Sequence, residues 1–184
     1  QRNYFRIIQS NSDLLLRLIN DILDLSRLEA NKVILTPEDC DVVQLCRQAL
    51  SSVEMSRRES GNRFVFETKT DSFVLQTDIQ RLQQVLINLL TNAAKFTKNG
   101  TITLQFEVEK EKNRVLFAVA DTGCGIPKEK QKQVFERFEK LNEYAQGTGL
   151  GLSICKLTVD KWGGDIWIDP DYEGGARFVV SHPL

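Results

Sequence analysis

The chain has 184 residues, enough for one domain with a full hydrophobic core and a helical appendage. Its 24 basic and 25 acidic side chains nearly cancel, which argues against the clustered positive surface of a nucleic-acid-binding protein. No apolar run is long enough to cross a membrane and no signal peptide is visible, so no membrane contact is expected from these residues. The four cysteines form no C-x-x-C pair, and the chain has one histidine. A zinc site is therefore not expected, and the thiols are expected to be free in a reducing cytoplasm.

A long amphipathic helix is predicted from Tyr4 to about Ala30. Its apolar side chains repeat with a heptad period, and the stripe is wider than that of a two-stranded coiled coil, as in a helical bundle. The heptad positions are Ile8, Leu15, Leu18, Ile22 and Leu25, and the stripe is widened by Leu14, Ile19 and Leu28. Because a lone helix cannot bury such a face, we expect its partner on a helix absent from this sequence or on another chain.

Beyond a hinge at Pro37, the sequence mixes helices and strands without strict alternation. We expect helices to begin at Asp41, Asp78 and Pro127 and after the glycines of 147–151. Strands are expected at 64–68, 73–77, 101–109, 114–121, 165–169 and 176–182, with 101–109 and 114–121 forming a hairpin. This order predicts an α+β fold in which a mixed, largely antiparallel sheet is covered on one face by helices and preceded by one long helix.

The helix that begins after Asp78 carries a polar ridge. Asn88, Asn92 and Lys95 lie within about 60° of one another around the helix axis, away from its apolar face. Two amide oxygens and an ammonium group suit a hard cation together with an anionic ligand, such as Mg²⁺ bound to a phosphate. A solvated helix face explains the same ridge if this helix is considered alone.

The stretch "DTGCGIP", residues 121–127, follows an apolar strand. An ionised Asp121 only accepts hydrogen bonds, so an adenine amine is a suitable donor for it. Gly123 and Gly125 permit positive φ and let a flat ligand approach the backbone.

A second glycine-rich stretch, "GTGLGLSI" at 147–154, precedes a helix whose free N–H groups favour phosphate. It lacks the Lys-Ser/Thr pair of a P-loop, and no strand leads into it as a dinucleotide-binding motif requires.

Four motifs in this order resemble the N, G1, F and G2 boxes of sensor histidine kinases, the two-component branch of the GHKL ATPases. They are "NLLTNAAKFT", "DTGCGIP", "FERF" (135–138) and "GTGLGLSI". The resemblance implies the Bergerat-type α/β sandwich. Residues 1–32 resemble the second helix of a dimerisation and phosphoacceptor hairpin, and residues 33–184 resemble the catalytic ATP-binding domain.

The resemblance implies ATP and Mg²⁺ as cofactors and gives each motif residue a role. Asn92 would bind the metal, Lys95 would contact phosphate, and Asn88 and Lys95 would be the catalytic pair. Phe135 and Phe138 would anchor a lid at about 139–148, although ordinary core packing explains both side chains equally well. The ATP-binding residues that it implies are Asn88, Asn92, Lys95, Asp121, Gly123, Gly125, Ile126, Lys140, Gly147, Thr148, Gly149, Leu150, Gly151 and Leu152.

Asn88 stands where hydrolytic relatives carry a glutamate, and an amide does not act as a general base at neutral pH. The resemblance thus implies phosphoryl transfer to a histidine rather than efficient ATP hydrolysis. His182 lacks the context of an acceptor, so we expect the acceptor upstream of Gln1. The implied partners are a response regulator receiver domain and a second copy that pairs through the hairpin helices. Whether the parent protein spans a membrane stays open.

The sequence also departs from the family pattern at Ala176, where a small hydroxyl residue is frequent, which predicts a modest loss of nucleotide affinity.

A different enzyme class stays open as well, because Asp-Thr-Gly at 121–123 is typical of half of an aspartic protease dyad. Two competing functions keep the fold: a nucleotide-sensing interaction module without turnover, and a serine kinase of the anti-sigma type.

Overall fold

The computed structural model describes residues 2–139 and 147–184. Its helices are α1 (Arg2–Glu29), α2 (Val42–Ser56), α3 (Ile79–Phe96) and α4 (Gly151–Lys161), with 3₁₀ turns at Arg58–Ser60, Lys110–Lys112, Lys128–Lys130 and Gln133–Phe135. Its strands are β1 (Glu38–Asp41), β2 (Arg63–Thr68), β3 (Val74–Thr77), β4 (Thr101–Glu109), β5 (Arg114–Asp121), β6 (Ile166–Ile168) and β7 (Arg177–Pro183).

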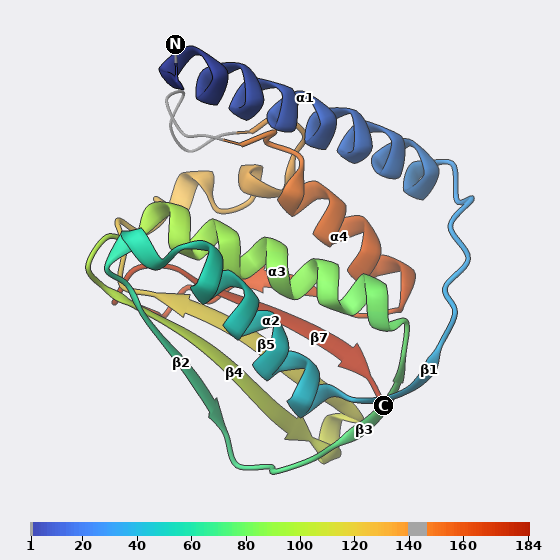
Figure 1. Ribbon diagram of the computed structural model, residues 1–184. Coiled ribbons are helices and arrows are strands. Elements are labelled where there is room, and N and C mark those ends of the chain that lie inside the picture. Colours follow the sequence, from blue (N-terminus) through green and yellow to red (C-terminus); the bar gives the residue numbers. More distant parts are fainter. Residues whose placement is uncertain (1, 140–146) are drawn as a thin grey trace.

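Five strands form one mixed sheet in the order β2-β4-β5-β7-β6. Only β2 and β4 run parallel, and the other neighbours are antiparallel. Helices α2, α3 and α4 form a layer against this sheet, and α1 lies over α4 on the side away from the sheet (Figure 1). The expected α+β sandwich with a long helix in front of it is therefore confirmed.

The β4–β5 hairpin shows how the sequence sets the sheet. Ile102, Leu104 and Phe106 alternate along β4 and are all buried, and β5 pairs with β4 from Asp121 back to Arg114. Because side chains alternate between the faces of a strand, this register turns one apolar row toward the helices. It also places Asp121 at the C-terminal end of the central strand, opposite Ile102.

Two aspartates begin the helices of the core, as the sequence predicted. The Asp41 carboxylate accepts hydrogen bonds from the backbone N–H groups of Val43 and Gln44, and Asp78 accepts one from Arg81. Such caps each contribute about 1 kcal/mol by satisfying donors that the first helical turn leaves open.

The expectation of an α-helix beginning at Pro127 is wrong. The chain there forms two single 3₁₀ turns, and Val134 is the buried side chain within them. With so few apolar positions at helical spacing, packing energy does not extend the turns into an α-helix.

Helix α1 buries only its C-terminal half. Leu25 and Leu28 pack with Val33, Leu150 and Ile154 in a small apolar cluster, with Leu18 and Leu157 at its border. Farther toward the N-terminus the apolar side chains are exposed, including Tyr4, Phe5, Ile8 and Leu15. The position of the boundary between the hairpin helix and the catalytic domain, drawn after residue 32 from the sequence, stays a prediction.

We predict that Leu86→Ala destabilises the protein by about 2–5 kcal/mol, because Leu86 is fully buried in α3 and its truncation leaves a cavity in the main core. Urea unfolding followed by circular dichroism measures this loss. Met55→Ala, at an exposed position on α2, is the matched control and is expected to change the free energy of unfolding by less than about 0.5 kcal/mol. Equal effects of the two substitutions would contradict this description of the core.

Candidate nucleotide-binding site

The polar ridge of α3 lies at the border of its buried face. Leu82, Leu86, Leu89 and Leu90 are all at most 1% exposed, whereas the ridge residues Asn88, Asn92 and Lys95 are half-buried. These three side chains line a cleft of about 440 Å³. The ridge thus faces a hollow rather than open solvent, which disfavours the solvated-face interpretation.

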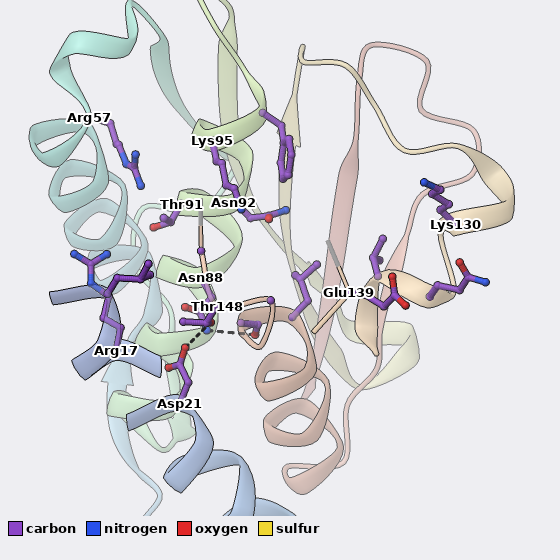
Figure 2. A pocket seen from close by; sticks show the side chains of 18 of the residues that line it. Arg17, Asp21, Arg57, Asn88, Thr91, Asn92, Lys95, Lys130, Glu139 and Thr148 are labelled. Carbon is purple, nitrogen blue, oxygen red and sulfur yellow. Dashed lines mark hydrogen bonds between the residues drawn. The ribbon is translucent and has the colours of Figure 1, made fainter. Parts of the chain in front are cut away.

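The cleft lies between α1, α3 and the loop that leads into α4, and Figure 2 shows its lining. Among the residues predicted from the sequence, it gathers Asn88, Asn92, Lys95, Gly147, Thr148, Gly149, Gly151 and Leu152. Two motifs that are about fifty residues apart in the sequence therefore meet at one surface.

The loop before α4 approaches α3 closely, and glycine allows this. A Cβ atom on Gly147 would lie 3.1 Å from Nζ of Lys95, and φ of Gly147 is +135°. The Asn88 side chain donates a weak hydrogen bond of 3.4 Å to the Gly151 carbonyl oxygen. Asn88 thereby ties α3 to the first residue of α4.

The N-terminus of α4 differs from those of α2 and α3. Its N-cap residue is Leu150, whose side chain cannot cap, whereas α2 and α3 begin with aspartates. The first-turn N–H groups of α4 are thus left for another acceptor, and the helix dipole favours an anion there. This end of α4 suits a phosphate group.

Asp121 lies at the end of β5 and is only 4% exposed. Its Oδ1 accepts hydrogen bonds from the backbone N–H groups of Gly123 (2.9 Å) and Ala176 (3.4 Å). Burial raises the pKa of this carboxyl group, while the two backbone donors and the Thr97 side chain act in the opposite direction. The carboxylate is therefore held in one orientation in a poorly hydrated place.

The backbone at Gly123 and at Gly175 lies close to other main-chain atoms around Asp121. A Cβ atom on Gly123 would lie 2.3 Å from the Phe96 carbonyl oxygen, and one on Gly175 would lie 2.2 Å from the Asp121 carbonyl oxygen. Glycine is required at both positions because any side chain would collide with main-chain atoms.

Asp121 and Asn92 share a second, small hollow that adjoins the cleft. Its lining residues are Asn92, Phe96, Asp121, Gly125, Ile126, Ala176 and Phe178. Asn92 and Phe96 border both hollows, so a ligand at Asp121 reaches the cleft past Asn92. The hollow has a volume of about 10 Å³, so a flat base at Asp121 would have to displace the side chains that line it, whereas the cleft of about 440 Å³ has room for a phosphate chain.

The two lid anchors predicted from the sequence differ in their environment. Phe135 packs edge-on against Phe178, with ring centroids 6.0 Å apart. Phe138 is 60% exposed and has a φ of +58°. Lys140, the predicted phosphate contact, lies outside the described residues, as does most of the predicted lid.

His182 takes part in neither hollow. It is 6% exposed in β7, and its ring packs against Trp162 with centroids 5.0 Å apart. Burial lowers its pKa because the cationic form loses hydration, so the ring is neutral in the folded protein at pH 7.

One wall of the cleft was not predicted from the four motifs. Ser10, Asn11, Leu14, Arg17 and Asp21 of α1 line it, as does Arg57, which follows α2. The Thr148 hydroxyl donates a hydrogen bond of 2.8 Å to the Asp21 carboxylate. The only sequence signal for this wall was that Arg17 and Asp21 are four residues apart, hence on one helix face.

Within residues 2–139 and 147–184, no group of three or more histidine, cysteine, aspartate or glutamate side chains is placed to hold a metal ion. A Mg²⁺ ion bound by the Asn92 amide oxygen and phosphate oxygens needs no such cluster, since it keeps much of its water shell. In the same part of the chain, no helix is apolar and long enough to span a membrane.

Comparison with known proteins gives the family. A family model described as histidine kinase-, DNA gyrase B- and HSP90-like ATPase matches residues 77–184. The chain belongs to this family. The aspartic protease interpretation is therefore wrong, and the resemblance to the catalytic domain of sensor histidine kinases is confirmed.

The relatives are histidine kinases that are longer than this chain. The circadian input-output histidine kinase CikA of Synechococcus elongatus is 38% identical over the whole chain, which spans 25% of that protein. The sensory kinase SasA of a Nostoc species is 30% identical over 99% of the chain and 46% of its own length.

Two solved structures share the fold over nearly the whole chain. Full-length ShkA in complex with AMPPNP superposes with a TM-score of 0.87 at 31% identity, covering the whole chain and 38% of ShkA. The histidine kinase ThkA in complex with the response regulator protein TrrA gives 0.78 at 30% identity, covering 98% of the chain and 50% of ThkA.

We predict that Asp121→Asn stabilises the free protein at neutral pH. Because the folded-state pKa of Asp121 is raised, its charged form opposes folding above that pKa, and the penalty disappears as the pH falls toward the ordinary pKa of aspartate. Urea unfolding without nucleotide, at about pH 7 and about pH 4, measures the difference from wild type.

The gain is expected at the higher pH and is expected to shrink at the lower one. Asp71→Asn, at an exposed loop position, is the control and should show no such pH dependence. A stability difference for Asp121→Asn that stays constant with pH would contradict the buried-carboxylate description.

Proposed function

We propose that this chain is the ATP-binding catalytic part of a sensor histidine kinase. It transfers the γ-phosphoryl group of Mg-ATP to a histidine on a separate hairpin helix, and the phosphoryl group then passes to a response regulator. The observation that carries the proposal is that Asp121 and Asn92 line one hollow, and that Asn92 also lines the neighbouring cleft together with Lys95 and the loop from Gly147 to Gly151.

At the base end, the Asp121 carboxylate accepts a hydrogen bond from the adenine amine. Its Oδ1 already binds two backbone N–H groups, so its orientation is fixed before the nucleotide arrives. Guanine presents a carbonyl oxygen at the corresponding position, which a carboxylate repels. Asp121 therefore selects adenine over guanine.

At the phosphate end, the residues act by position and charge. Lys95 and the uncapped N-terminus of α4 offset the negative charge that spreads over the phosphates during transfer. Asn92 would hold Mg²⁺, which draws phosphate oxygens together and neutralises charge when bound. Asn88 provides no general base, so water is not activated as a nucleophile.

The hairpin interpretation of α1 is supported by its exposed apolar face. Ile8 and Leu15 are about 60% exposed, and Tyr4 and Phe5 more than 70%. A helix of this kind is stable in water when another helix covers it. We propose that the covering helices belong to the hairpin and to a second copy of the protein.

We predict that Asn92→Asp weakens binding of Mg-ATP by at least about tenfold, because it adds negative charge beside the phosphates. Asp121→Asn is expected to lower the preference for ATP over GTP. Isothermal titration with ATP and GTP, with and without Mg²⁺, measures both effects. Asn3→Asp on exposed α1 adds the same charge away from the cleft and serves as the control. If Asn92→Asp and Asp121→Asn both left the affinity and the selectivity unchanged, the assignment of the site would be wrong.

We also predict that the purified chain does not phosphorylate itself but phosphorylates a separately supplied hairpin that carries the acceptor histidine. Radiolabelled ATP followed by gel electrophoresis measures both reactions. Asn88→Asp is expected to weaken this transfer while leaving the chain folded, because position 88 is half-buried at the border of the core. Acid-labile phosphate on His182 of this chain would contradict the proposal.

A further inference from the structure

Two arginines outside the four motifs line the nucleotide cleft. Arg17 comes from α1 and Arg57 follows the last residue of α2, so they reach the cleft from two different elements. Figure 2 shows both to the left of Asn92, on the side where Thr91 lies. Lys95 and the start of α4, which have a role in the proposed function, belong to the rest of the lining.

Neither guanidinium group has an anionic partner among residues 2–139 and 147–184. Four other arginines are in ion pairs: Arg81 with Asp24, Arg114 with Glu109, Arg137 with Glu29 and Arg177 with Asp169. The exposed Arg6 and Arg58 are in none, but they do not line the cleft. A guanidinium presents several N–H donors in one plane and is well matched to phosphate oxygens. Two arginines without an anion at the edge of one cleft are therefore open to an anionic ligand.

The main chain holds Arg57 in place. Its N–H group donates to the Glu54 carbonyl oxygen, and its own carbonyl oxygen accepts from the backbone N–H (3.0 Å) and the hydroxyl (2.7 Å) of Ser60. The side chain is half-buried and lines the cleft. Such fixed donors bind a ligand with a smaller loss of conformational entropy.

The docking of α1 places the backbone of Arg17, whose own side chain is exposed, at the cleft. Asp21, one turn farther along the helix, accepts the hydrogen bond of Thr148, and both Asp24 oxygens lie 2.8 Å from one guanidinium nitrogen of Arg81. Residues four apart share a helix face, so Arg17 and Asp21 both point to the cleft. The cluster of Leu25 and Leu28 with Leu150 fixes the same face.

The charges of the cleft favour an anion with several negative charges. Four cationic side chains of the described residues line it, against two anionic ones, and one of these, Asp21, is hydrogen-bonded to Thr148. The cationic side chains are Arg17, Arg57, Lys95 and Lys130. A single phosphate does not need this many cations, whereas a triphosphate chain does.

We propose that Arg17 and Arg57 bind the terminal phosphates of the nucleoside triphosphate, together with Lys95 and the N-terminus of α4. This inference rests on the proposed function, because the base must lie at Asp121 for its phosphates to pass Asn92 into the cleft. The helix of the phosphoacceptor hairpin then contributes a phosphate ligand of its own. Its affinity for the catalytic domain depends on whether the γ-phosphate is present.

The test measures binding of AMPPNP, ADP and AMP, each with Mg²⁺, to the variants Arg17→Gln and Arg57→Gln by isothermal titration. Each variant is expected to weaken AMPPNP binding about three- to tenfold, ADP binding less, and AMP binding not at all. The losses are expected to grow when the ionic strength is lowered, since screening weakens these contacts. Arg17→Lys and Arg57→Lys, which keep the charge, are expected to recover most of the affinity.

Matched controls remove the same charge outside the cleft. Arg6→Gln lies on exposed α1, and Arg58→Gln is the exposed neighbour of Arg57; neither position lines the cleft. Both controls are expected to bind all three nucleotides like the wild type. A urea unfolding curve for every variant verifies that it is folded.

The outcomes separate this inference from the proposed function. A wild-type chain that binds none of the three nucleotides would contradict the proposed function itself. A wild type that binds AMPPNP, with Arg17→Gln and Arg57→Gln equal to their controls, would overturn only the arginine contacts. A loss of the same size for AMP as for AMPPNP would also overturn them, because AMP lacks the terminal phosphates.

Discussion

The nucleotide site depends on the burial of one face of α3. Leu82, Leu86, Leu89 and Leu90 bury almost all their surface, and no other rotation of the helix about its axis would do so. A turn by one residue, about 100°, would bring the ridge of Asn88 and Asn92 into the apolar core, where an unpaired amide costs about 1–3 kcal/mol. The apolar core therefore sets the direction in which the polar ridge points, and it does so before any ligand binds.

At the other end of the site, folding and binding oppose each other. Asp121 is a carboxylate at 4% exposure, and burial without a cation raises its pKa, which means that its charged form is disfavoured. The hydrogen bonds from the backbone N–H groups of Gly123 and Ala176 reduce this cost. Both are donated to Oδ1, and neither reaches Oδ2. A ligand amine that donates to the carboxylate recovers part of this cost, which converts lost stability into affinity.

The sequence was most informative where the cause of the structure is local. The caps at Asp41 and Asp78 and the alternation along 101–109 follow from neighbouring residues, and the structure has them as predicted. The turn after Pro127 was mistaken for an α-helix. Proline is tolerated as the first residue of a helix, but the residues after it do not provide the apolar face that would stabilise one. The wall formed by Arg17 and Asp21 could not be predicted, since the Asp21–Thr148 bond joins residues 127 positions apart. Four short motifs gave the family, but none of them includes Arg57 or a residue of α1.

The contacts that dock α1 explain why this wall matters. They consist of a small apolar cluster and a few partly exposed polar pairs, such as Asp24–Arg81, and pairs of this kind contribute about 0–1 kcal/mol each. Contacts this few let a ligand in the cleft change the strength of docking. If Arg17 contacts a phosphate of the nucleotide, linkage requires that the nucleotide strengthen docking of α1 by the same factor as docking strengthens nucleotide binding. Loss of the γ-phosphate by transfer removes that contribution, so the reaction itself loosens the helix that walls its own cleft.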